Sequence, residues 1–172
     1  MKFYDLVPSQ EFDPKIALMI ATLHDSTREW KSELCEPTED AIVWQPYENA
    51  PSIGGQLLHL IGVEAFWFES FLAQAERPVG ERELLMADQI NVDDHIWPAP
   101  HRKPIQWYYE LLDTVRARAL KALAPLDVNL SRHMRDEYEF TLPWVIGHVI
   151  QHDSYHGGQA VLLHEMYKRM AT

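Results

Sequence analysis

The pattern of apolar and polar residues along the chain predicts four long helices. In the first, from about Asp13 to Leu34, apolar side chains recur every three or four residues, as on one buried helix face. Asp13 suits the N-cap and Pro14 suits the first helical position. The apolar positions of this helix are Ile16, Ile20, Leu23, Trp30 and Leu34.

The second predicted helix starts near Ser52, runs to about Ala75 and is apolar on two opposite sides. One side carries Ile53, Leu57, Ile61, Phe68 and Leu72, and the other carries Gly55, His59, Gly62, Val63 and Phe66. Because such a helix is buried on both sides, it is either central to the domain or packed against a second subunit. Glu64 falls within the first side and needs a hydrogen-bonding partner there.

The third helix begins near Pro104 and ends before Pro125, and we expect Arg116, Arg118 and Lys121 to form its solvated face. Residues 76–104 look irregular, apart from a short helix near 82–87. A connection of this length suggests a functional loop over a site, although its His95, Trp97 and His101 are expected at the surface. Residues 126–140 are interpreted as another connector.

The last helix follows Thr141 as a cap, has Pro143 in its first turn and continues to about Lys168. Gly157 and Gly158 weaken this helix, which suggests a close backbone approach or simply a tolerated cost. The face expected to point into the protein comprises Val145, His148, Val149, His152, Tyr155, His156, Gln159, Leu163 and Met166.

Three histidines in this last helix are the most informative feature of the sequence. His148, His152 and His156 follow one another at four-residue steps, so they share one helix face. Neutral imidazole is a common ligand of Zn, Ni and Fe, and two histidines four residues apart can chelate one ion. All three cannot, because His148 and His156 lie about 12 Å apart along the axis. The pair is therefore 148/152 or 152/156, unless the cluster is purely structural and hydrogen-bonded.

A further ligand has to come from another helix, and His59 is a sterically sensible candidate because small residues surround it. A ferritin-like di-iron site is excluded, because no Glu lies three residues before any His. Asp153 takes the place of the glutamate in the zincin motif, but its side chain is shorter.

Composition narrows the functional classes. The 172 residues suit a single domain spanning 1–172, and the net charge of −11 argues against nucleic acid and against anionic membranes as partners. No apolar run is long enough for a membrane span, and the first residues lack the apolar core of a secretory signal. Cys35 is the only cysteine, which excludes an internal disulfide and a thiolate metal site, so we expect a cytoplasmic protein.

Two segments give the chain a family resemblance. Residues 52–67 (SIGGQLLHLIGVEAFW) and 152–159 (HDSYHGGQ) resemble motifs of the DinB/YfiT-like family, and the order of the four helices agrees over essentially the whole chain. The resemblance implies an all-α, up-down-down-up four-helix bundle, often homodimeric, with a long connection between helices 2 and 3. It also implies one divalent metal ion held by His59, His152 and His156, with His148 as a neighbour. Where the family often has Arg, this chain has Gly157.

The resemblance covers metal-dependent thiol transferases, thiol-dependent isomerases, hydrolases and members of unknown activity. Three neutral imidazoles leave the ion its full charge and open coordination positions, as in catalytic sites. We therefore expect a metal-dependent S-transferase or hydrolase acting on a small molecule, with a low-molecular-weight thiol as a candidate partner. Candidates for catalytic roles are His148, Tyr155 and Gln159. The alternative is a non-catalytic, stress-related protein that binds a metal or a small ligand.

Overall fold

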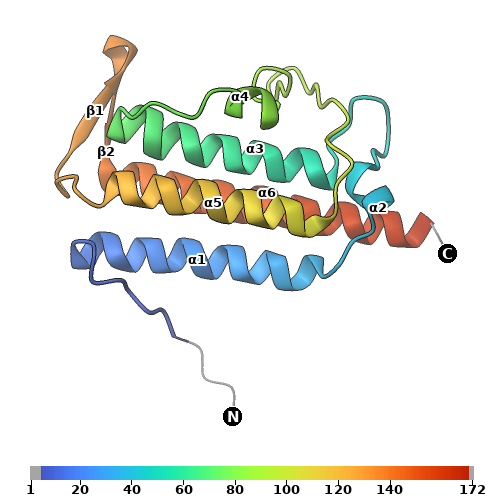
Figure 1. Cartoon of the computed structure of the whole chain (residues 1–172), viewed down its shortest axis with the longest axis horizontal. Helices are drawn as coiled ribbons and strands as arrows, with labels where there is room; N and C mark the ends of the chain where they lie inside the picture. Colours follow the sequence, from blue (N-terminus) through green and yellow to red (C-terminus); the bar gives the residue numbers. More distant parts are fainter. Residues whose placement is uncertain (1–4, 171–172) are drawn as a thin grey trace.

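Four long helices lie side by side in the computed structural model, which describes residues 5–170 (Figure 1). They are α1 (Pro14–Leu34), α3 (Ile53–Ala65), α5 (Ile105–Leu123) and α6 (Leu142–Met170). α1 and α6 run in one direction and α3 and α5 in the other, because a long crossover separates α3 from α5. The all-α class and the up-down-down-up arrangement predicted from the sequence are therefore confirmed.

Shorter elements join and extend these helices. They are α2 (Glu39–Val43), the π-helix η1 (Phe66–Ala73), α4 (Glu81–Leu84), the strands β1 (Ser131–Met134) and β2 (Tyr138–Thr141), and the 3-10 turn η2 (Arg135–Glu137). η1 continues α3 directly and ends at Gln74, whose backbone is left-handed, so the predicted second helix is a composite of two helix types. The expectation that 126–140 is only a connector was wrong, because β1 and β2 pair as an antiparallel hairpin.

Side-chain caps fix where α1, α3 and α6 begin, and the sequence predicted the caps at Asp13 and Thr141. Asp13 Oδ1 accepts a hydrogen bond from the Lys15 amide at 2.9 Å, and Ser52 Oγ accepts one from the Gly55 amide at 3.1 Å. Thr141 Oγ1 accepts one from the Trp144 amide at 3.3 Å, which starts α6 directly after β2. Each cap satisfies a helix-terminal N–H that has no partner within the helix.

Two apolar clusters fill the bundle, with a polar layer between them along its axis. One cluster contains Trp30, Leu58, Leu112 and their neighbours, and the other contains Leu23, Phe68, Val145 and theirs. On each long helix, one buried polar residue lies close to the boundary between the clusters. These residues are Thr27 of α1, Glu64 of α3, Arg116 of α5 and Asp153 of α6.

Arg116 is the centre of this layer, and the expectation that it lies on a solvated face was wrong. Its guanidinium donates to Glu64 Oε2 at 2.6 Å, to Asp153 Oδ1 at 3.2 Å and to Thr27 Oγ1 at 2.6 Å. Trp30 Nε1 completes the layer by donating to Asp153 Oδ2 at 3.0 Å. The layer thus ties all four helices together and supplies the partner that Glu64 required.

Arg118 is also paired rather than solvated. It donates to Glu69 of η1 and to Glu81 of α4, which holds the start of the crossover against the bundle. Later in the crossover, Trp97 is only 5% exposed, so the expectation of a surface residue was wrong for it, whereas His95 is exposed as expected.

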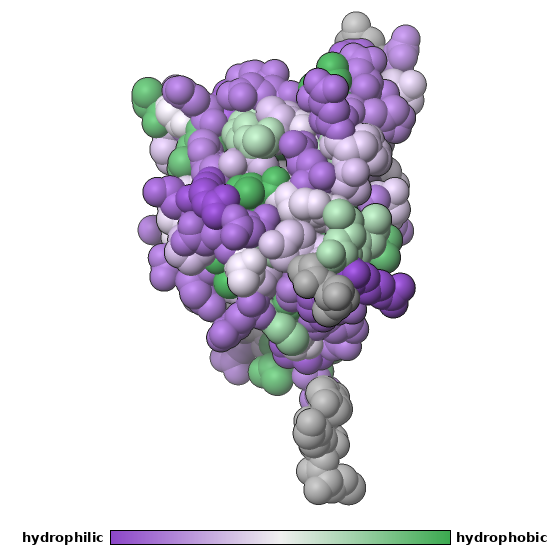
Figure 2. All heavy atoms as spheres, turned by 90° about the vertical axis from the view of Figure 1, so that its right-hand side faces the viewer, coloured by the Kyte–Doolittle hydropathy of each residue, from purple (hydrophilic) through white to green (hydrophobic). Residues whose placement is uncertain are grey.

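The surface agrees with burial of the apolar residues inside the bundle. Figure 2 shows one end of the molecule, where hydrophilic residues cover most of the surface and apolar groups form small separate patches. Within residues 5–170, no helix combines the length and the hydropathy that crossing a membrane requires.

Candidate metal centre

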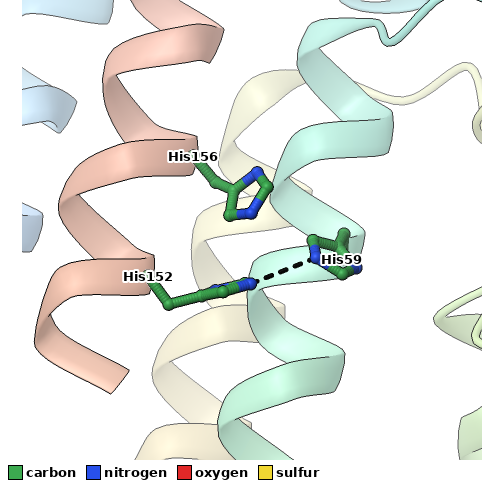
Figure 3. A group of neighbouring side chains, drawn as sticks. All are labelled: His59, His152 and His156. Atoms are coloured by element: carbon green, nitrogen blue, oxygen red, sulfur yellow. Dashed lines mark hydrogen bonds between the residues drawn. The ribbon is translucent and has the colours of Figure 1, made fainter. Parts of the chain in front are cut away.

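Three histidines from two facing helices converge at one point between α3 and α6. His152 and His156 occupy successive turns of α6, and His59 faces them from α3 (Figure 3). One ring nitrogen from each of the three can be chosen so that all lie within 4.8 Å of one another. His152 Nε2 lies 3.1 Å from His59 Nε2. Of the two pairs left open by the sequence, 152/156 is therefore the one that meets His59.

Gln56 sets the orientation of one of these rings. It is buried one turn before His59, and its Oε1 lies 2.6 Å from His156 Nδ1. Because an amide oxygen only accepts, His156 donates through Nδ1–H and keeps the lone pair of Nε2 free. A hydrogen bond that fixes one ring nitrogen so that the other can bind an ion is the usual arrangement at histidine metal sites. Gln56 was not among the residues expected at the site, although it lies three residues before His59 in the segment that resembles the family.

Trp97 closes the site from the crossover. Its ring meets that of His59 edge to face, with centroids 5.5 Å apart. The ring also packs over Gly55, where an added Cβ would lie 3.4 Å from Trp97 Cε3, an ordinary van der Waals contact. Of the small residues expected to leave space beside His59, Gly62 does so, because a Cβ there would meet no atom within 4 Å, whereas Gly55 is covered by Trp97.

Burial keeps the three imidazoles neutral. Desolvation, reinforced by its neighbour His156, lowers the pKa of His59 to about 4. Desolvation and the nearby histidines lower the pKa of His152 to about 2. Desolvation also lowers the pKa of His156 to about 4, against an opposing hydrogen bond with Gln159. At neutral pH all three rings therefore carry lone pairs, which is the form that binds metal ions.

The donor set fits a divalent ion. A tetrahedral Zn²⁺ with nitrogen ligands at 2.0–2.1 Å requires these ligands to be about 3.3 Å apart. The 3.1 Å between His152 and His59 is close to that spacing, so one pair of donors is already near ligand geometry. In the cluster formed by the described residues, no carboxylate joins the three rings, so a bound ion would keep its positive charge.

The other candidate residues lie around the centre rather than in it. His148 stacks on Trp144 with ring centroids 5.1 Å apart, and it lines a shallow groove with His152 and Tyr155. Tyr155 is 63% exposed, so its expected place on the inward face was wrong, and the same is true of Met166 at 40%. Gln159 is half-buried and contacts His156.

Asp153 and Gly157 point away from the histidines and fix α6 against α1. Asp153 accepts hydrogen bonds from Ser26, Thr27 and Trp30, which rules out the position of a zincin-type base. A Cβ on Gly157 would lie 2.3 Å from Trp30 Cδ1, which accounts for the glycine as a close approach of two helices. At Gly158 a Cβ would meet nothing within 4 Å, so that glycine is a tolerated cost.

A cavity of about 230 Å³ lies beside His59, between α3 and the start of the crossover. Its walls are mostly apolar, and Gly62 keeps it open because no atom lies within 4 Å of a Cβ placed there. Arg77 and Arg82 of the crossover also line it. The long connection between helices thus does cover a cavity next to the histidine cluster, as its length suggested.

Comparison with known proteins agrees with this architecture. The family model of the DinB superfamily matches residues 16–160, which include all four long helices in large part and all three clustered histidines. None of the curated proteins compared with the chain matches it. The family match covers most of the chain, and the helix order and the two family motifs lie within it. The chain therefore belongs to the DinB superfamily.

Proposed function

We propose that this protein is a divalent-metal-dependent enzyme that transfers a thiol to a small electrophile or hydrolyses a small molecule. The observation that carries the proposal is the convergence of His59, His152 and His156, with one nitrogen of each within 4.8 Å of the others. We assign Zn, Ni or Fe as the candidate ions, because imidazole ligands suit all three. A bound ion of this kind supplies Lewis-acid activation of a thiol or of water.

The protein's own residues prepare the site for such chemistry. Gln56 holds the His156 ring in one orientation, and Trp97 shields one side of His59 from water. The adjoining cavity offers space for a small substrate next to His59. Three neutral ligands leave coordination positions for substrate, which favours a catalytic over a structural site. The partner we propose is accordingly a small molecule, with a low-molecular-weight thiol as the second reactant in the transfer reaction.

Activity of the reconstituted protein tests this proposal. Cys35 is exposed and would react with electrophiles by itself, so the assays use a Cys35→Ser background. The protein, loaded in turn with Zn, Ni and Fe, is given small thiols with 1-chloro-2,4-dinitrobenzene, and separately 4-nitrophenyl acetate. We expect metal-dependent turnover in one of the two assays.

A matched pair of variants completes the test. His152→Ala removes a proposed ligand, whereas His133→Ala removes a histidine that is 68% exposed on the hairpin. We expect the first to abolish turnover and the second to preserve it. Equal turnover in both variants would contradict the proposal. A metal-loaded protein that is inactive toward both substrate classes would favour a non-catalytic metal-binding protein instead.

A further inference from the structure

The cavity beside His59 contains an arginine whose hydrogen bonds are incompletely satisfied. The Arg77 side chain is only 10% exposed, and its Nη2 is buried without any hydrogen-bond partner among residues 5–170. Buried polar groups in folded proteins nearly always have a partner, and a charged group without one is costly. Arg77 also lines the cavity. A small rotation of the guanidinium would therefore bring the buried Nη2 to the cavity wall, where an acceptor could take the hydrogen bond that it lacks.

The neighbouring carboxylates do not serve as that acceptor, and they already accept hydrogen bonds from other donors. Arg77 Nε donates to Glu81 Oε2 at 2.8 Å, while Arg118 Nη2 takes Glu81 Oε1 at 2.6 Å. Arg118 also holds Glu69 through two further hydrogen bonds. Two arginines and two glutamates thus form a network without net charge, in which each oxygen of Glu81 already has an arginine donor.

The second arginine at this cavity is in a different position. Arg82 is 63% exposed and pairs with Asp88, so it contributes a solvent-screened ion pair at the edge. The remaining walls are largely apolar and include Leu58, Val63, Phe66, Leu85 and Ile90. The cavity therefore combines an apolar interior with one buried guanidinium that still lacks a hydrogen-bond acceptor, a combination that suits a ligand with an apolar body and one negative group.

We propose that Arg77 binds the carboxylate of a small, otherwise apolar substrate that occupies this cavity, with His59 lining the same space. A carboxylate is the anion of choice because its oxygen can accept the hydrogen bond that Nη2 lacks while Nε stays on Glu81, and a hydrogen bond between two charged groups is stronger than one between neutral groups. The volume of about 230 Å³ limits the ligand to a small aliphatic or aromatic acid. This inference rests on the proposed function for its meaning as a substrate site and names the substrate class.

Hexanoate and its neutral counterpart hexanamide are suitable probes, and binding is followed by NMR on the full-length protein. The background is His152→Ala, which removes a proposed metal ligand, so that a carboxylate cannot owe its binding to the ion. We expect hexanoate to shift the Arg77 Nε–H resonance and to bind at least about tenfold more tightly than hexanamide, as charge-assisted hydrogen bonds do.

Three further variants locate the binding. Arg77→Gln is expected to weaken hexanoate binding by about tenfold or more, whereas Arg28→Gln, on an exposed arginine of α1, leaves it unchanged. Gly62→Leu fills the cavity and is expected to abolish binding of both probes. If Arg77→Gln fails to fold, Arg77→Lys replaces it. The shift of the Arg77 side-chain resonance on addition of hexanoate then tests the same contact without any substitution at position 77.

The outcomes separate this inference from the proposed function. Equal affinity for hexanoate and hexanamide, or undiminished hexanoate binding by Arg77→Gln, would overturn it. Hexanoate binding that occurs only in the metal-loaded protein would also overturn it and leave the metal centre standing. If the protein with all three histidines never takes up metal but hexanoate binding still depends on Arg77, the anion site is supported and the metalloenzyme is refuted.

Discussion

Two adjacent glycines of α6 offer a direct test of how this helix is held in place. Replacing either by alanine removes the helix-weakening effect of glycine and is worth about 1 kcal/mol in an open position. The two positions differ in their surroundings. The new Cβ at Gly158 would meet no atom within 4 Å, whereas at Gly157 it would lie 2.3 Å from Trp30 Cδ1 and 2.4 Å from Trp30 Cγ.

Trp30 cannot move aside freely, and this sets the magnitude. Its Nε1 donates to Asp153 Oδ2 at 3.0 Å, so a shift of the ring disturbs the buried polar layer. Insertion of a methyl group into a packed core costs about 1–3 kcal/mol, and disturbing a hydrogen bond to a charged group adds about 1.5–3 kcal/mol. After the gain of about 1 kcal/mol in helix propensity, we expect Gly157→Ala to lower the free energy of unfolding by roughly 1.5–5 kcal/mol.

Urea unfolding followed by circular dichroism measures the effect, in the presence of a chelator because His156 adjoins Gly157. Gly158→Ala is the matched control and is expected to be as stable as the unsubstituted protein or more stable, by up to about 1 kcal/mol. In thermal unfolding, 1 kcal/mol corresponds to about 2–4 °C for a chain of this size. If Gly157→Ala proved as stable as Gly158→Ala, the close packing of α1 on α6 would be refuted.

Three further predictions concern the buried polar groups. Arg116→Met leaves the carboxylates of Glu64 and Asp153 buried without their cation and should cost about 3–5 kcal/mol in urea unfolding; an effect below about 1 kcal/mol would contradict the polar layer. Gln56→Ala frees the His156 ring and should raise the dissociation constant for metal by roughly 10–100-fold in a competition titration with a chelating dye; an unchanged constant would count against its orienting role. Burial lowers the pKa of His156 to about 4 from an unfolded value near 6.5, so the unfolded state takes up protons that the native state does not between these pH values. The free energy of unfolding of the metal-free protein should therefore be highest above about pH 6.5 and should decrease as the pH drops toward 4. In urea titrations at pH 7 and pH 5, this decrease should be smaller for His152→Ala, which lacks one of the desolvated rings. An identical pH dependence of the two proteins would argue against desolvated histidines.

The helices and the histidine cluster could be predicted because their signals are local and periodic. Asp13 and Pro14 mark a helix start by themselves, and the four-residue spacing of His152 and His156 places both rings on one face. The choice of His59 needed the family resemblance as well, because spacing within one helix does not reveal which residue faces it. The assignment of these residues as metal ligands stays a prediction.

Residues whose role depends on a partner elsewhere in the chain could not be placed in this way. Arg116 was expected in solvent because of its charge, although it lies four residues after Leu112 on the buried stripe of α5. Its neutralising carboxylates come from two other helices, and no pattern within α5 shows them. That position on the apolar stripe was the available signal.

The packing of the crossover and the pairing of the hairpin could not be predicted from the sequence for a different reason. Trp97 lies in an irregular segment without periodicity, so nothing local indicates that it packs on His59. The strands 131–134 and 138–141 have four residues each and show no clear alternation of apolar and polar side chains. β1 contacts η1, which lies far earlier in the chain, and no pattern within the two strands shows that contact.

Metal content is the measurement that tests the central claim most directly. The purified protein, reconstituted with Zn, Ni and Fe in turn, is measured by elemental mass spectrometry beside alanine variants of His59, His152, His156 and His148. We predict about one ion per chain, lost in the first three variants and kept in the fourth, as three converging imidazoles require. No bound ion under any of these conditions, or an ion that survives loss of His152, would contradict the account.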